Sequence, residues 1–214
     1  MRESLAQEEI KRSGVIGIIR IQTAEDLVGI AEALYAGGLA CIEITMNTPG
    51  ALRAIESARE RLPHVVLGAG TVLDGVTARE AILAGAQFLV TPTVKLDVLE
   101  VAHRYSIPAI IGAMTPTEIL TVWEAGAAMV KVFPASVLGP RYLQELHGPL
   151  PQIPLVPTGG ITADNAPEFI RAGAVAVCVG SWLVDKKAVA EGRYELLTER
   201  ARQLVEAVRK ARGA

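Results

Sequence analysis

Short runs of apolar residues recur along the chain at nearly constant spacing. They cover residues 15–20, 41–45, 65–69, 88–91, 109–112, 129–133, 155–158 and 176–180, and neighbouring runs begin 20 to 26 residues apart. This spacing holds one strand, one helix and two short loops. The runs are almost continuously apolar, which is typical of parallel strands that are covered on both faces.

Helical patterns of polar and apolar residues fill the intervals between the runs. They include residues 24–36, 49–61, 94–105 and 116–125, and further helices are expected at 1–13 and 191–209. Two of these helices are predicted to begin at a threonine followed by a proline, in Thr48-Pro49 and Thr115-Pro116. A threonine hydroxyl can accept from a free N–H group of the first turn, and proline suits the first helical position.

Eight strand–helix units in 214 residues predict an α/β fold of the (β/α)8 TIM-barrel type, close to its lower size limit. An open, doubly wound sheet is the alternative. The count of eight favours the barrel, and no Gly-x-Gly-x-x-Gly motif follows the first run. The length fits one domain, so we expect residues 1–214 to form a single barrel domain with an extra N-terminal helix.

Composition and charge narrow the functional classes. The chain has 21 Lys and Arg against 23 Asp and Glu, a formal net charge of −2. This balance argues against general nucleic-acid binding. Half of the residues are hydrophobic but only 4% are aromatic, so the core is expected to consist of Ala, Val, Leu and Ile.

Metal sites, disulfides and membrane segments are not expected. The three histidines are scattered, which leaves no metal-ligand spacing. Cys41 and Cys178 lie in apolar runs, as buried free thiols of a reducing compartment do. The first 12 residues lack a signal-peptide apolar stretch, and the apolar runs fall far short of the roughly 20 residues that span a membrane. We therefore predict a cytoplasmic protein without membrane contact.

Polar and small residues gather where the predicted strands end, which is where barrels carry their functional residues. Alternation along a strand puts Glu43 and Thr45 on one face, and Lys131 on the face of Met129 and Phe133. If these faces line the interior, Glu43 and Lys131 enter one cavity from opposite strands. The candidate site residues are Arg20, Glu43, Thr45, Thr71, Pro92, Lys131, Phe133, Thr158, Gly159, Gly160, Gly180 and Ser181.

Lys131 interrupts the apolar run Met129-Val130-Lys131-Val132-Phe133. Apolar surroundings disfavour the charged form of an amine, and the neutral amine can attack a ketone to form a Schiff base. The structural alternatives are a lysine on an edge strand and a lysine that is paired with Glu43.

Glu43 is a similar anomaly in the run Cys41-Ile42-Glu43-Ile44-Thr45. A buried carboxyl group must be paired, or its pKa rises toward the range of a general acid or base. Schiff-base chemistry needs such a group to transfer protons. The structural alternative is an ion pair with Lys131, although a buried pair adds little net stability.

Two glycine-containing segments suggest a phosphate site. Pro157-Thr158-Gly159-Gly160-Ile161 and Val179-Gly180-Ser181-Trp182 follow the seventh and eighth runs, where barrels commonly bind phosphate. Glycine allows backbone N–H groups to approach an anion. One such segment is typical of an ordinary turn, but two at consecutive strand ends favour phosphate binding.

From Val15 to Val184 the chain resembles the class I aldolases that cleave 2-keto-3-deoxy-6-phosphogluconate (KDPG), including members that act on 4-hydroxy-2-oxoglutarate (KHG). The resemblance is carried by Ile42-Glu43-Ile44-Thr45, Gly68-Ala69-Gly70-Thr71, Val90-Thr91-Pro92, Met114-Thr115-Pro116, Val130-Lys131-Val132-Phe133-Pro134, Thr158-Gly159-Gly160 and Val179-Gly180-Ser181-Trp182. It implies cleavage of KDPG to pyruvate and glyceraldehyde 3-phosphate, and of KHG to pyruvate and glyoxylate. It also implies a homotrimer and no cofactor or metal.

The resemblance further implies roles for individual residues. Lys131 would be the Schiff-base lysine and Glu43 the general acid and base. Thr71 and Pro92 would line the pocket for the pyruvate half. The phosphate of the aldehyde half would bind at Gly159, Gly160 and Ser181.

One position departs from the family pattern. Many members carry an arginine two residues after the threonine of the second strand, where this chain has Asn47. Arg20, at the end of the neighbouring strand, could supply the missing guanidinium for a carboxylate. Alternatively, Asn47-Thr48-Pro49 and Gly139-Pro140-Arg141-Tyr142 resemble the aldolases for the 6-phosphogalactonate epimer (KDPGal).

Two further alternatives stay open at this point. One is a different phosphate-binding enzyme barrel, such as an isomerase or a thiamin-phosphate synthase. The other is a non-catalytic phosphosugar-binding barrel, because a fold does not fix a function.

Overall fold

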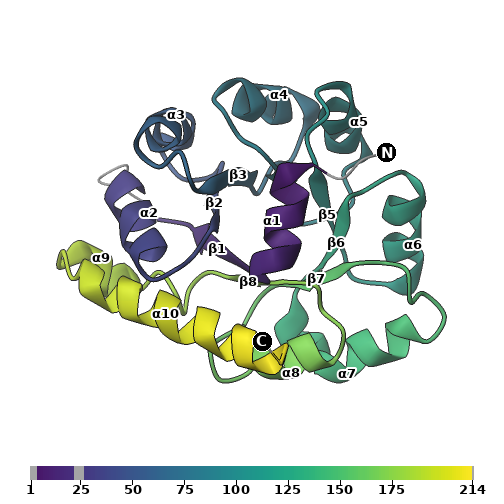
Figure 1. Cartoon of the computed structure of the whole chain (residues 1–214). Coiled ribbons are helices and arrows are strands. Elements are labelled where there is room, and N and C mark those ends of the chain that lie inside the picture. The colour runs from purple at the N-terminus through teal and green to yellow at the C-terminus, as the bar shows by residue number, and fades with distance from the viewer. Residues whose placement is uncertain (1–3, 22–26, 214) are drawn as a thin grey trace.

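Eight parallel strands surround the centre of the molecule, and helices enclose them (Figure 1). The computed structural model describes residues 4–21 and 27–213. The strands are β1 (Val15–Ile19), β2 (Cys41–Thr45), β3 (Val66–Gly70), β4 (Leu89–Val90), β5 (Ala109–Ala113), β6 (Met129–Val132), β7 (Leu155–Pro157) and β8 (Val177–Val179).

The strands are hydrogen-bonded in the order β7-β6-β5-β4-β3-β2-β1-β8. A parallel bridge between Thr158 and Cys178 joins the two ends of this order and closes the sheet. Closure confirms the (β/α)8 prediction, and the open doubly wound alternative is wrong.

Helices follow the strands along the chain. They are α1 (Leu5–Ser13), α2 (Leu27–Ala36), α3 (Ala51–Arg61), α4 (Gly75–Leu83), α5 (Leu96–Arg104), α6 (Pro116–Glu124), α7 (Ala135–His147), α8 (Ala166–Arg171), α9 (Lys186–Ala190) and α10 (Tyr194–Ala211). The expected beginnings of the first two helices, at residues 1 and 24, lie outside the described residues.

The two predicted threonine caps have different outcomes. Thr115 accepts from the backbone N–H of Glu118, whose carboxylate accepts in turn from the N–H of Thr115, so this capping box is confirmed. The prediction for Thr48 is wrong, because α3 begins at Ala51. The hydroxyl of Thr48 lies 3.0 Å from that of Thr45 instead, so it ties the β2 end to the following turn.

The barrel interior is packed at the amino ends of the strands. Side chains that alternate inward from the strands form one apolar cluster, which contains Ile16, Ile18, Cys41, Phe88, Val90, Ile110, Met129, Val156, Ala176 and Cys178. Helix α1 lies across this end of the barrel (Figure 1) and adds the fully buried Ile10 to the cluster. Gly68 makes room for a ring in this layer, since a Cβ there would lie 2.4 Å from Phe88.

The outer faces of the strands pack against the helices. Leu34, Ile55 and Leu204 are fully buried members of this larger apolar cluster. Aliphatic residues dominate both clusters, as the low aromatic content predicts. None of the helices in the described residues combines the length and the apolar character that crossing a membrane requires.

Replacing Ile10 with Ala tests whether α1 acts as the plug of the barrel. The variant leaves a cavity under the interior cluster, so we expect the free energy of unfolding to fall by about 2–5 kcal/mol. Chemical denaturation measures this change. Leu5→Ala is the control because Leu5 lies on the same helix and is 85% exposed, and its effect should stay within about 0.5 kcal/mol. Equal effects of the two changes would contradict the plug.

Candidate active site

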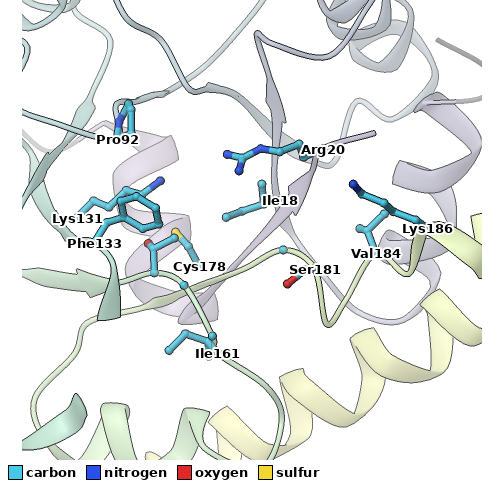
Figure 2. Close-up of a pocket in the computed structure, with 14 residues that line it drawn as sticks. Ile18, Arg20, Pro92, Lys131, Phe133, Ile161, Cys178, Ser181, Val184 and Lys186 are labelled. Carbon is cyan, nitrogen blue, oxygen red and sulfur yellow. The ribbon is translucent and has the colours of Figure 1, made fainter. Parts of the chain in front are cut away.

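A cavity of about 450 Å³ opens at the carboxyl ends of the strands. Its walls come from the ends of β1, β4, β6, β7 and β8 and from the segment that leads into α9 (Figure 2). Most of the residues predicted from the sequence line it, namely Arg20, Pro92, Lys131, Phe133, Thr158, Gly159, Gly160, Gly180 and Ser181. The structure therefore brings together residues from both halves of the chain.

Lys131 is held in the wall of the cavity by strand pairing. Its Cα pairs with Gly112 of β5 and Val156 of β7. The side chain is only 3% exposed, yet its amine points into the cavity, and Nζ lies 5.4 Å from the ring centroid of Phe133 (Figure 2). An amine in this position is sheltered from bulk water but accessible to a molecule inside the cavity.

Glu43 projects from β2, on the opposite side of the barrel from β6. It is completely buried, and neither carboxylate oxygen has a hydrogen-bond partner among the described residues. Gly70 of β3 makes room for this group, since a Cβ there would lie 2.4 Å from Oε1 of Glu43. The structural ion pair with Lys131 is therefore not formed.

The surroundings of Glu43 favour its protonated form. Burial raises the pKa of the carboxyl group, and the positive charges of Lys131 and Arg20 oppose that rise without cancelling it. A carboxyl group without hydrogen bonds costs free energy in an apolar interior. Such a group is typical of a proton donor or acceptor for a ligand rather than of a structural contact.

Arg20 follows β1, and its guanidinium extends across the cavity in the direction of Lys131 (Figure 2). Its Nη2 donates a hydrogen bond of 3.0 Å to the hydroxyl of Thr71. Thr71 has a positive φ of 54° at the end of β3, a conformation that is uncommon for a residue other than glycine. The two residues thus form one polar wall near Lys131, although Thr71 itself does not line the cavity.

Thr45 and Glu43 are the other predicted residues outside the cavity lining. Thr45 is fully buried, and its hydroxyl donates to the backbone oxygen of Ile19 at 3.3 Å. The hydroxyl contacts Thr48 on its other side. These contacts satisfy the group, so Thr45 joins β1 to the turn after β2. Asn47, in that turn, is exposed.

The glycine segments after β7 and β8 face the other part of the cavity. Gly159 and Gly160 have positive φ angles of 99° and 68°, which glycine adopts without strain. Within the described part of the chain, no group accepts from the backbone N–H of Gly159, Gly160 or Ser181. Adjacent free N–H groups in a left-handed turn are suited to an anion.

Five cavity residues were not among the candidates. They are Ile18, Ile161, Cys178, Val184 and Lys186. Strand alternation places Ile18 on the same face as Arg20, and Cys178 on the same face as Gly180. The sequence does not single them out, because apolar residues in a strand do not indicate a chemical role. Burial raises the pKa of the Cys178 thiol to about 12, so it stays protonated. The local sequence of Lys186 carries no signal, because it lies in a polar stretch at a helix start.

Comparisons with known proteins agree with this geometry. The family of aldolases described as KDPG and KHG aldolase matches residues 6–199. The 2-dehydro-3-deoxy-phosphogluconate aldolase of Treponema pallidum is 37% identical over 202 residues, which cover 94% of this chain and 96% of that protein.

Two solved structures have closely similar folds. One is the KDPG aldolase from Legionella pneumophila with pyruvate captured at low pH as a covalent carbinolamine intermediate. It is 32% identical with a TM-score of 0.87, and the match covers 94% of this chain and 98% of that chain. The other, described as a native KDPGal structure, is 30% identical with a TM-score of 0.87, and covers 94% and 96%. The family match spans most of the chain, so the chain belongs to the KDPG and KHG aldolase family.

Proposed function

We propose that this chain is a class I aldolase, a carbon–carbon lyase that cleaves KDPG to pyruvate and glyceraldehyde 3-phosphate. The observation that carries the proposal is the amine of Lys131, which is sheltered from bulk water and points into the cavity. The chain that holds this amine belongs to the KDPG and KHG aldolase family. Cleavage of KHG to pyruvate and glyoxylate uses the same steps. An assay for released pyruvate tests the reaction, and binding without release would favour a non-catalytic phosphosugar-binding barrel.

The reaction begins when the neutral amine of Lys131 attacks the C2 ketone. The resulting carbinolamine loses water and becomes an iminium, which withdraws electrons from C3. The C4 hydroxyl loses its proton, the C3–C4 bond breaks, and its electron pair forms the enamine of pyruvate. The aldehyde leaves, the enamine is protonated at C3, and water hydrolyses the iminium to free pyruvate and Lys131.

Glu43 is the proton carrier in this proposal. Protons must leave the carbinolamine nitrogen and the C4 hydroxyl and must reach the leaving hydroxide and the enamine carbon. The carboxyl group of Glu43 lies close enough to Lys131 for the charge of the lysine to affect its pKa, and neither of its oxygens is hydrogen-bonded to a described residue. Burial raises the pKa of this carboxyl group, which favours a group that can both donate and accept a proton. Glu43 acts directly or through one water molecule.

Arg20 is the candidate for the carboxylate of the pyruvate half. The carboxylate is one bond from the ketone carbon, so it must lie near Lys131 when the Schiff base forms. The guanidinium of Arg20 points into that part of the cavity and already donates to Thr71 (Figure 2). A guanidinium can donate two parallel hydrogen bonds to a carboxylate, so Arg20 takes over the task of the arginine that is missing at Asn47.

Among the two sugar epimers, the gluconate form is favoured. The Treponema relative is named for the gluconate acid and is 37% identical, against 30% for the structure described as KDPGal. The segment at Gly139 that resembles the galactonate enzymes lies in α7, outside the cavity lining. There the hydroxyl of Tyr142 donates to the backbone oxygen of Met114 at 2.6 Å, which is a structural contact.

The assembly expected from the family resemblance and the location expected from the sequence both stay predictions. The expected homotrimer and the cytoplasmic location have direct tests in the mass of the protein in solution and in cell fractionation. A phosphorylated keto sugar acid is the expected small-molecule partner, and no nucleic acid is expected.

Reduction with borohydride in the presence of pyruvate tests the Schiff base. We expect a stable adduct on the peptide that contains Lys131, found by mass spectrometry. Lys131→Ala should form no adduct and should lose activity by about a thousandfold or more, because the covalent step is gone. Circular dichroism checks that the variant is folded. An adduct on any other lysine, or none in the unmodified protein, overturns the mechanism.

The raised pKa of Glu43 predicts a dependence of stability on pH. The unfolded carboxyl group, with a pKa near 4.5, loses its proton while the folded one still holds it, so stability falls as pH rises above that value. Glu43→Gln removes this loss. We therefore expect the variant to gain stability relative to the unmodified protein between pH 4 and 8, as measured by denaturant unfolding. A difference that stays constant over this range would contradict the raised pKa.

Arg20→Ala tests the carboxylate partner. We expect the pyruvate concentration for half-maximal borohydride trapping to rise about tenfold or more, because a charged hydrogen bond is lost. Arg20→Lys should recover part of the affinity, since it keeps the charge but not the paired donors. Unchanged affinity in Arg20→Ala would assign the carboxylate to another group.

A further inference from the structure

Lys186 brings a second exposed cation to the cavity. It is the first residue of α9 and lines the same cavity as Lys131. In Figure 2, Lys186 lies on the far side of Ser181 from Lys131, and its amine turns back toward the cavity. The two lysines therefore mark different parts of the site.

The charged side chains that line the cavity are all basic. They are Arg20, Lys131 and Lys186, and no carboxylate is among the lining residues that the structure describes. Glu43 lies buried behind the lining and is biased toward its neutral form. A cavity with such walls attracts a ligand that carries more than one negative charge.

Lys186 is not neutralised by its neighbours in the described part of the chain. The carboxylate of Asp185 accepts from the N–H of Ala188 at 2.8 Å and lies 3.4 Å from Nη1 of Arg200. The adjacent Lys187 lies 3.9 Å from the carboxylate of Glu191. Among residues 4–21 and 27–213, no such ion pair involves Lys186, so no described carboxylate neutralises its charge.

The other two basic residues are already assigned to the pyruvate half. Lys131 bonds to the ketone carbon, and Arg20 lies beside it with its contact to Thr71. The glycine segments after β7 and β8 offer backbone N–H groups but no cationic side chain. A phosphate carries nearly two negative charges, and a lysine amine is a common phosphate partner.

We propose that Lys186 binds the terminal phosphate of the substrate, beside Ser181 and the glycine turn, and sets the preference for phosphorylated over unphosphorylated sugar acids. This inference depends on the proposed aldolase function, because it assigns a residue to the aldehyde end of the same substrate. It places one counter-charge at each end of the ligand, with the bond that breaks between them.

The proposal is tested by comparing KDPG with the unphosphorylated 2-keto-3-deoxygluconate in an assay of pyruvate release. For Lys186→Ala we expect KM for KDPG to rise about tenfold. This corresponds to the lower part of the free-energy range for a hydrogen bond to a charged group. The kcat for KDPG should change much less. The value of kcat/KM for KDPG, divided by that for 2-keto-3-deoxygluconate, should fall by a similar factor. Lys186→Arg should keep most of that ratio, because the charge remains.

Lys187→Ala is the matched control, since it removes the same charge one residue away from the cavity lining. In Lys187→Ala, the ratio of kcat/KM for KDPG over 2-keto-3-deoxygluconate should equal that of the unmodified protein. An unchanged ratio of kcat/KM in Lys186→Ala would overturn the proposal. An equal fall of that ratio in Lys187→Ala would also overturn it, because general electrostatic attraction of the phosphate would then explain the effect. Borohydride trapping of pyruvate by the unmodified protein separates the hypotheses. Failed trapping rejects the aldolase function, whereas trapping with an unchanged ratio rejects only the role of Lys186.

Discussion

An ionisable group inside a closed apolar barrel costs free energy unless it is paired or neutral, and the site is organised around this cost. Glu43 is fully buried with both oxygens unpartnered among the described residues. Burial raises its pKa, while Lys131 and Arg20 limit the rise. Gly70 is the residue that leaves space for the carboxyl group. The other interior residues form an apolar cluster, and within it the result is a carboxyl group suited to moving protons.

The two ends of the barrel divide the tasks of stability and chemistry. At the amino ends of the strands, α1 and Ile10 cover an apolar interior. At the carboxyl ends, the interior becomes a cavity with Lys131 in its wall. Strand pairing holds the backbone of Lys131 between β5 and β7, so the proposed nucleophile is positioned by a strand and not by a loop. The loops then supply groups that differ between related barrels.

The charges of the cavity match the shape of a keto sugar acid with two anionic ends. Arg20 lies near Lys131, where the carboxylate must lie, and Lys186 lies beyond Ser181 (Figure 2). Between them, in the proposed mechanism, the amine of Lys131 attacks the ketone and the C3–C4 bond breaks. Binding energy from the distant phosphate can then help to position the ketone for attack, because the two ends fix the orientation of the chain between them.

Local patterns were enough to predict the eight strands, the cap at Thr115 and the two anomalous residues, Lys131 and Glu43, because periodicity and a charge in an apolar run are local signals. It failed at Thr48, whose hydroxyl contacts Thr45 across the turn instead of capping a helix. The contact between Arg20 and Thr71 and the cavity that Lys186 shares with Lys131 become visible in the folded chain alone. Such contacts depend on how the closed barrel and its loops bring distant segments together, and a local pattern carries no information about that arrangement.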